Sequence, residues 1–193
     1  MRLSLLPLLL LTPLSACISF GGKAPDQLLS LTAESSLPAG TVRNVAVGAG
    51  LVVAVPETPR KIDTYRVAVQ VDETSIAYVA DTQWVDRPGR LFQRLLSETI
   101  AANTGRVVLN PDQFSGEPST RLQGELIDFG IDARSSQAVV TYDAILLGDN
   151  GATMTKRRFS ATRPVSPIEP ARVGRALNDA ANDVAAQVAV WVG

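Results

Sequence analysis

Residues 138–162 read AVVTYDAILLGDNGATMTKRRFSAT, and this stretch decides the fold class because it has the pattern of a β-hairpin. Asparagine and glycine accept positive φ angles, so Asp149-Asn150-Gly151 is a strong signal for a tight turn. The sequence predicts a strand from Ala138 to Leu147 before the turn and a partner strand from Met154 to Thr162 after it. Strands joined by so short a turn pair antiparallel.

Other segments upstream also have strand patterns. Tyr65 to Val71 alternates apolar and polar residues, as a half-buried strand does. The valine-rich segment from Val42 to Val55 ends at Pro56, which has no amide to donate to a sheet. The remaining predicted strands are Ile76 to Val79, Arg106 to Leu109 and Leu122 to Ile131.

Two segments have helical periodicity instead. One begins at Pro88 and stops at Gly105, and the other begins at Glu169 or Pro170. The side chains predicted to share the buried faces are Leu91, Phe92, Leu95, Leu96, Thr99 and Ile100 in the first, and Val173, Leu177, Ala180, Val184, Val188 and Trp191 in the second. Strands, a helix, a meander and a second helix predict an α+β fold with a mainly antiparallel sheet packed by two amphipathic helices.

The first residues have the parts of a secretory signal. Arg2 supplies a positive start, Leu3 to Leu11 an apolar region, and Ser15-Ala16 the small residues before a cleavage point. A membrane-spanning helix needs roughly 20 apolar residues, and this run is shorter and is interrupted by proline. We therefore expect the α+β domain to lie behind a cleaved leader.

Leu14-Ser15-Ala16-Cys17 resembles the lipobox of bacterial lipoproteins. That resemblance implies that Cys17, the only cysteine of the chain, is lipidated and becomes the first residue of the mature protein. The residue after it is Ile18 and not aspartate, which resembles lipoproteins that are sorted by default to the outer membrane. The predicted organisation is a lipoprotein signal peptide over 1–16, a lipidated N-terminus and tether over 17–27, and a single domain over 28–193.

Composition excludes several functions. The 193 residues carry a net charge of −1, which gives no electrostatic footprint for nucleic acid. The chain contains no histidine, which removes serine–histidine and cysteine–histidine catalysis and histidine-bearing zinc sites. It also has no G-x-x-x-x-G-K-[ST] loop for a nucleotide. We expect no cofactor, no metal and no catalytic residue.

A few residues allow two interpretations. Asp63, Asp81 and Asp86 are carboxylates that acid–base chemistry could use, although acids of loops and helix starts are the commoner case. Tyr78 and Trp84 are either core aromatics or part of a partner surface, where such residues are enriched. The basic run Lys156-Arg157-Arg158 is either a solvated strand end or a contact at the rim of a partner surface.

Several motifs occur in the order found in one family. They are Ile62-Asp63-Thr64, Arg66-Val67, Ile76-x-Tyr78, Asp81-x-x-Trp84-x-Asp86-Arg87-Pro88, Leu91-Phe92-Gln93, Gly124-Glu125-Leu126 with Phe129, and Arg158-Phe159-Ser160. With the lipobox before them, the chain resembles the ABC-type transport auxiliary lipoproteins, the PqiC-like family, over roughly residues 28–192. The start departs from the pattern, because Asp26-Gln27-Leu28 stands where many members carry tyrosine.

The resemblance implies a component rather than an enzyme. Members accompany an ABC permease, its ATPase and an Mce-domain protein that move lipids or other apolar compounds between the two membranes. The auxiliary lipoprotein is held on the outer membrane, faces the periplasm and helps to dock that machinery. The alternative is an envelope enzyme or an activator of a cell-wall synthase, which would present a nucleophile or carboxylate pair in a pocket where an adaptor presents a groove or patch.

Overall fold

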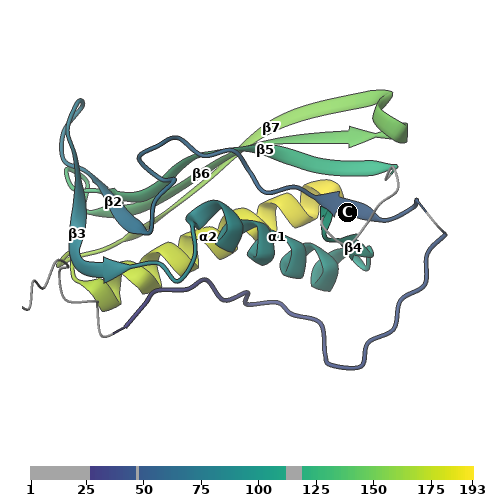
Figure 1. The fold of residues 1–193 in the computed structure, drawn as a ribbon, viewed down its shortest axis with the longest axis horizontal. Helices are drawn as coiled ribbons and strands as arrows, with labels where there is room; N and C mark the ends of the chain where they lie inside the picture. Colours follow the sequence, from purple (N-terminus) through teal and green to yellow (C-terminus); the bar gives the residue numbers. More distant parts are fainter. Residues whose placement is uncertain (1–26, 47, 112–118) are drawn as a thin grey trace, which may run out of the picture.

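The structure is a computed structural model that describes residues 27–46, 48–111 and 119–193. It is an α+β domain of two layers, in which a mixed seven-stranded sheet lies over two helices (Figure 1). The helices are α1 (Pro88–Thr104) and α2 (Pro170–Val192). The strands are β1 (Leu51–Val53), β2 (Arg66–Gln70), β3 (Ile76–Gln83), β4 (Val108–Leu109), β5 (Thr120–Asp132), β6 (Gln137–Gly148) and β7 (Thr153–Pro164).

The predicted hairpin is confirmed. β6 and β7 pair antiparallel from Gln137↔Pro164 to Gly148↔Thr153. The turn between them is a single 3₁₀ turn, η2 (Asp149–Gly151), in which Asn150 has φ 56° and Gly151 has φ 88°. Both angles lie in the left-handed region that asparagine and glycine tolerate best.

β5 is the strand on which the sheet is assembled. On one side it pairs antiparallel with β6 over nearly its whole length. On the other side it pairs parallel with β1 near its start and with β2 near its end. Gly124 allows β5 and β6 to approach, because a Cβ at this position would lie 2.0 Å from the carbonyl oxygen of Asp143. The antiparallel pairings are the long ones, as predicted, while the short parallel pairings were not predicted.

One predicted strand is mostly absent. Among its described residues, the segment from Val42 to Val55 contributes only β1, which is fully buried, whereas Val42 and Val45 are exposed. Valine content raises strand propensity, but a strand also needs a neighbour to pair with. Only Leu51–Val53 lies between β5 and β4, so only these residues form a strand.

The two helices bury the predicted faces. All six predicted side chains of α1 are buried, and α1 ends where Gly105 takes φ 74°. α2 starts at Pro170 and buries Val173, Leu177, Ala180, Val184 and Val188, with Trp191 partly buried. Between helices and sheet runs a chain of aromatic contacts, Trp84–Phe129–Phe92–Tyr142, with ring centroids 5.3 to 6.4 Å apart. Burial raises the pKa of the Tyr142 phenol.

An N-terminal strap, residues 27–37, runs along α2 and reaches α1 at its end, where the Leu37 amide donates to Glu98 Oε1. Leu29 forms a parallel bridge with Trp84 and packs on Gly174 of α2. Further along, the Asn182 side chain accepts a hydrogen bond from the Glu34 amide and donates one to the Thr32 carbonyl. The strap therefore runs in the same direction as α2, and the first described residues lie beside the start of this helix (Figure 1).

Candidate docking groove

A groove of about 810 Å³ opens at the start of α1. Two segments form it, the crossing loop at residues 54–64 and the turn that leads into α1. The lining residues are Val55, Pro56, Glu57, Thr58, Asp63, Tyr65, Asp86, Arg87, Gly89 and Arg90. This groove collects Asp63 and the Asp86-Arg87 pair from the motifs that carried the family resemblance.

The floor of the groove is fixed by backbone contacts. The amide of Glu57 donates to the Gly124 carbonyl, and the amide of Leu126 donates to the Glu57 carbonyl, so the crossing loop is bound to β5. Gly89 lets α1 approach this loop, because a Cβ there would lie 3.3 Å from the Pro56 carbonyl oxygen. The crossing loop is therefore attached to β5 and packed against the start of α1.

The two aspartates of the groove are each paired with an arginine. Arg87 Nη1 donates to Asp63 Oδ1 at 2.6 Å, and this hydrogen bond raises the pKa of the Arg87 guanidinium. Asp86 accepts the Arg87 amide at 2.8 Å through Oδ1 and Arg94 Nη2 at 3.3 Å through Oδ2. Asp63 and Asp86 thus each have an arginine partner, and these two acids do not form a pair of one free acid and one free base.

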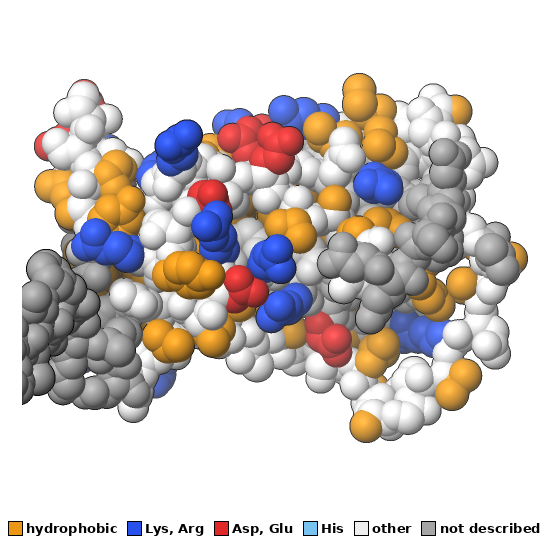
Figure 2. Space-filling model, in the orientation of Figure 1, with side chains coloured by type: hydrophobic (Ala, Val, Ile, Leu, Met, Phe, Trp, Pro, Cys, Tyr) orange, Lys and Arg blue, Asp and Glu red, His pale blue; other side chains and the backbone are white. Residues whose placement is uncertain are grey.

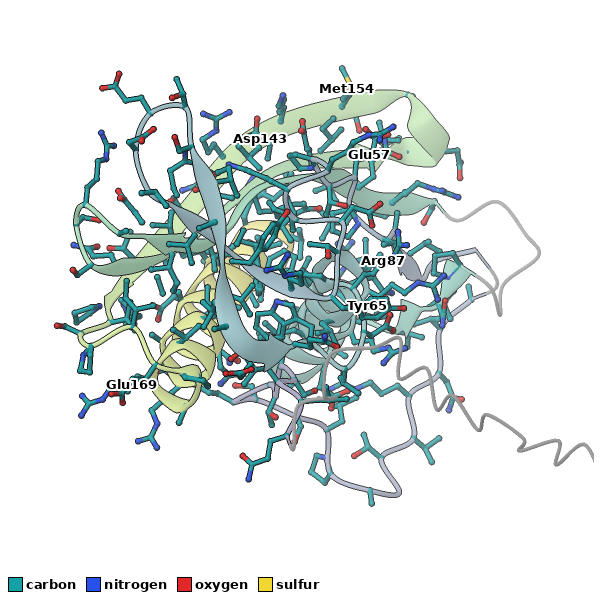
Figure 3. All side chains as sticks on the ribbon, turned by 60° about the vertical axis from the view of Figure 1, so that its left-hand side comes forward. Glu57, Tyr65, Arg87, Asp143, Met154 and Glu169 are labelled. Carbon is teal, nitrogen blue, oxygen red and sulfur yellow. The ribbon has the colours of Figure 1, made fainter. Side chains whose placement is uncertain are left out.

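The rim combines apolar and charged side chains. Tyr65 is 48% exposed and Val55 is 50% exposed, so both can contact a partner. Figure 3 shows Tyr65 beside Arg87, with Glu57 on the same side of the molecule. In Figure 2, basic, acidic and hydrophobic side chains are interspersed over the middle of this face. Tyrosine and arginine beside small apolar groups are typical of protein-docking surfaces.

The other predicted site residues that the structure describes, Tyr78, Asp81 and Trp84, do not line the groove. Trp84 is 1% exposed and contacts Phe129, so its position is that of a core aromatic. Tyr78 is half-buried, and the Arg66 guanidinium lies 4.2 Å from its ring centroid. Asp81 is exposed at φ 49° in β3 and does not line the groove. Cys17 lies outside the described residues.

The groove residues Val55, Tyr65 and Arg90 were not singled out from the sequence. Val55 and Tyr65 had been assigned to strands, and nothing in their local pattern distinguishes an exposed apolar side chain from a buried one.

Within the described ranges, no group of three or more histidine, cysteine, aspartate or glutamate side chains is arranged to hold a metal ion.

A second, smaller hollow of about 190 Å³ lies on the sheet, between β2, β5 and the crossing loop. Ala68, Ile76 and Val139 supply its apolar lining, and Lys61 and Asp128 form an ion pair of 2.8 Å beside it. Its volume is below that of usual small-molecule sites, which are about 300–1,000 Å³.

Comparison with known proteins identifies the family. The family model of the ABC-type transport auxiliary lipoprotein component matches residues 29–189. The chain belongs to this family, as its motifs predicted. The family is an auxiliary lipoprotein component of ABC-type transport, which associates the protein with an ABC transport system and with the cell envelope. No curated protein matches the chain.

Two solved structures share the fold at low sequence identity, and a third is similar at a lower TM-score. Protein XCC0632 from Xanthomonas campestris has a TM-score of 0.68 at 20% identity, covering 86% of this chain and 94% of that one. An uncharacterized protein has a TM-score of 0.66 at 12% identity, covering 86% of this chain and 100% of that one. The PelC dodecamer from Paraburkholderia phytofirmans has a TM-score of 0.44 at 17% identity, covering 80% of this chain and 90% of that one.

Proposed function

We propose that this protein is an outer-membrane lipoprotein that faces the periplasm and docks an Mce-type ABC transport system moving lipids or other apolar compounds between the membranes. The observation that carries the proposal is the groove at the start of α1. Its two aspartates are paired with arginines, its rim presents Tyr65 and Val55, and three of its lining residues, Asp63, Asp86 and Arg87, belong to the family motifs. Such a surface suits a protein partner better than an enclosed substrate.

Anchoring would be through Cys17. Neither described helix has both the length and the apolar character that crossing a membrane requires. A lipidated Cys17 would leave residues 18–27 as the tether, which reaches about 35 Å when fully extended. The domain would then stay close to the membrane while the groove remains free to meet an Mce-domain protein or the ABC permease and ATPase complex. Two or more acyl chains are needed for stable anchoring.

The proposed role is not enzymatic. One observation favours the alternative of an envelope enzyme or an activator of a cell-wall synthase, because Asp63 and Asp86 line the same groove. The ion pairs of both carboxylates argue against a catalytic pair, because Asp63 contacts Arg87 at 2.6 Å and Asp86 contacts Arg94 at 3.3 Å. Docking needs such charges only as complementary contacts, which tolerate single substitutions better than catalysis does.

The experiment is co-purification from detergent-solubilised envelopes together with an outer-membrane barrier assay. We expect the wild-type chain to co-purify with an Mce-domain protein, and Tyr65→Ala combined with Arg87→Glu to abolish this and impair the barrier. Arg172→Glu is the matched control, because Arg172 is an exposed arginine at the start of α2 and away from the groove. Equal co-purification of the groove variant and the control would contradict docking at the groove.

Two further variants separate the remaining parts of the proposal. Cys17→Ser should block lipidation and release the protein from the outer membrane, and a native protein whose intact mass lacks acyl chains would contradict anchoring. Asp63→Asn should retain barrier function. A folded and correctly localised Asp63→Asn protein with complete loss of barrier function would favour the enzyme alternative.

A further inference from the structure

The far edge of the sheet, β7, is open over its first half, whereas α2 contacts its second half. Among the described residues, β6 is the only strand that pairs with β7. The first six residues of β7, Thr153 to Arg158, are all exposed, although successive side chains of a strand point to opposite faces. Both faces are therefore open here. Figure 1 shows the end of the hairpin standing clear of the helices, and in Figure 3 Met154 points away from the body of the protein.

Side-chain contacts identify which backbone groups of β7 face outward. The Ser160 carbonyl accepts a hydrogen bond from Gln187 Nε2 at 3.5 Å, and the Thr162 carbonyl accepts one from Arg163 Nη1 at 3.1 Å. In an antiparallel pair, residues with both groups toward the partner alternate with residues that have both groups turned away. Continuing this alternation toward the turn, Met154, Lys156 and Arg158 also turn their amides and carbonyls away from β6.

The same part of β7 carries an excess of positive charge. Lys156, Arg157 and Arg158 are consecutive, and the only carboxylate that binds any of them in the described part of the chain is Asp143. Asp143 binds Lys156 Nζ at 3.3 Å and Arg158 Nε at 2.5 Å, which holds both cations in place beside the open edge. Arg157 lies on the other face, 5.0 Å from the Phe159 ring centroid.

We propose that β7 accepts an extended acidic segment of a partner protein as an additional strand, hydrogen-bonded to Met154, Lys156 and Arg158. Asp143 offsets one of the two charges of Lys156 and Arg158, so each face keeps an excess of positive charge, from this pair on one face and from Arg157 on the other. This charge favours glutamate or aspartate on both faces of the added strand, and the exposed Met154 favours an apolar residue beside it. In such strand addition the backbone gives affinity and the side chains give specificity. This surface is separate from the groove at α1, so the inference goes beyond the proposed docking function and does not depend on it.

Positive charge on an edge strand has a simpler role, which is to prevent edge-to-edge aggregation. The two roles differ in what they predict for an acidic strand. Protection against aggregation requires that extended segments in general be repelled or ignored. A docking edge should bind a segment of opposite charge and reject one of the same charge.

The test uses the full chain in detergent and two labelled peptides. One peptide alternates glutamate with valine, and the other alternates lysine with valine. We expect saturable binding of the acidic peptide by fluorescence anisotropy, with the lysine peptide at least about tenfold weaker. Hydrogen exchange should slow at the amides of Met154, Lys156 and Arg158 when the acidic peptide is bound. No saturable binding, equal binding of the two peptides, or protection elsewhere would overturn the proposal.

Variants separate backbone pairing from charge. Lys156→Pro removes an outward amide without removing a bond to β6, and it should weaken binding of the acidic peptide at least about tenfold. Lys156→Ala keeps the amide and should weaken this binding less. Arg157→Glu leaves the backbone intact and should also weaken binding, which keeps the test decisive if Lys156→Pro fails to fold. Arg87→Glu in the groove should leave peptide binding unchanged. Peptide binding that depends on Arg87 and not on β7 would overturn the proposal.

Sedimentation velocity provides the last discrimination. We expect the wild-type chain and Lys156→Pro to have the same oligomeric state in the absence of peptide. If the wild-type chain self-associates and Lys156→Pro does not, a second copy of the chain occupies the edge. That result would contradict the proposal that the edge binds an acidic segment of a partner protein.

Discussion

Arg158 binds the carboxylate of Asp143 through two side-chain nitrogens, with Nε 2.5 Å from Oδ1 and Nη2 2.9 Å from Oδ2. The pair joins β6 to β7 on the sheet face opposite the helices, where Asp143 is nevertheless only 7% exposed. Lys156 adds a third contact at 3.3 Å. A carboxylate with this little exposure is tolerated because two cations bind it directly.

These contacts make stability depend on pH. The hydrogen bond from Arg158, with further support from Lys156, lowers the pKa of Asp143 from 3.8 to about 2. Because the folded-state pKa is the lower one, the contribution of Asp143 is complete above the unfolded-state value and is lost as the pH falls toward 2. Asp143→Asn should therefore be less stable than wild type in urea near pH 6, and the difference should shrink near pH 3. A difference that is constant over this range would contradict the assigned role, and Asp81→Asn, at an exposed site, is the control.

The packing of α1 is tested by two neighbouring residues. Leu95 is 3% exposed, whereas the Arg94 side chain is 67% exposed and makes one contact of 3.3 Å to Asp86. Leu95→Asp places an unpaired charge in the core and should cost about 4 kcal/mol or prevent folding. Arg94→Ala should change the free energy of unfolding by less than about 1 kcal/mol. Similar urea midpoints for the two variants would show that α1 packs by another face.

The strap is tested at Asn182. This side chain is 4% exposed and makes hydrogen bonds to the Glu34 amide and to the Thr32 and Asn178 carbonyls, each of 2.9 Å. Asn182→Ala should lower the free energy of unfolding by about 2–3 kcal/mol, because buried backbone groups lose their partners. Hydrogen exchange of the Glu34 amide should accelerate. Asn178→Ala is the matched control, since its Oδ1 accepts only the Thr32 amide, and an equal effect of both variants would contradict the central place of Asn182.

The contact between β5 and β6 is tested at Gly124. An added Cβ would lie 2.0 Å from the Asp143 carbonyl oxygen, and this oxygen belongs to backbone that cannot move without breaking the sheet. Gly124→Ala should therefore cost about 3 kcal/mol or more in thermal or urea unfolding. Gly148→Ala is the control, because its added Cβ would meet only the Thr153 hydroxyl at 2.8 Å, which can rotate away. If Gly124→Ala were no more harmful than Gly148→Ala, the close approach would not be a constraint.

Local patterns predicted the parts of the fold that depend on neighbouring residues. The turn at Asn150-Gly151 and the buried faces of α1 and α2 follow from spacing alone, and the structure agrees with each. The parallel pairings of β5 with β1 and β2 join segments more than 60 residues apart, and no local pattern specifies them. For the same reason Val42–Val55 was assigned to a strand over a length that the sheet does not use.

The groove was less predictable than the fold. Asp63 and Arg87 were noted as parts of motifs, but their ion pair depends on how the crossing loop is bound to β5 through Glu57. That contact joins residues 57 and 124, which the sequence does not connect. The sequence also did not decide whether Trp84 is buried or exposed, because an aromatic residue in a motif has the same sequence pattern in both cases. The Trp84 ring is buried because it packs on Phe129 of β5, a contact between segments far apart in the sequence.

The direction of the strap has a mechanical consequence. Leu29 meets Gly174, Thr32 meets Asn178 and Glu34 meets Asn182, so the successive contacts run along α2 in register. A pull on residue 27 directed along the axis of α2 acts along this row and loads its bonds together in shear, instead of opening them one at a time. If Cys17 holds the protein to a membrane, traction from a moving partner would reach α2 through this row. The domain can then resist tension at its attachment point without unwinding a helix or separating the sheet.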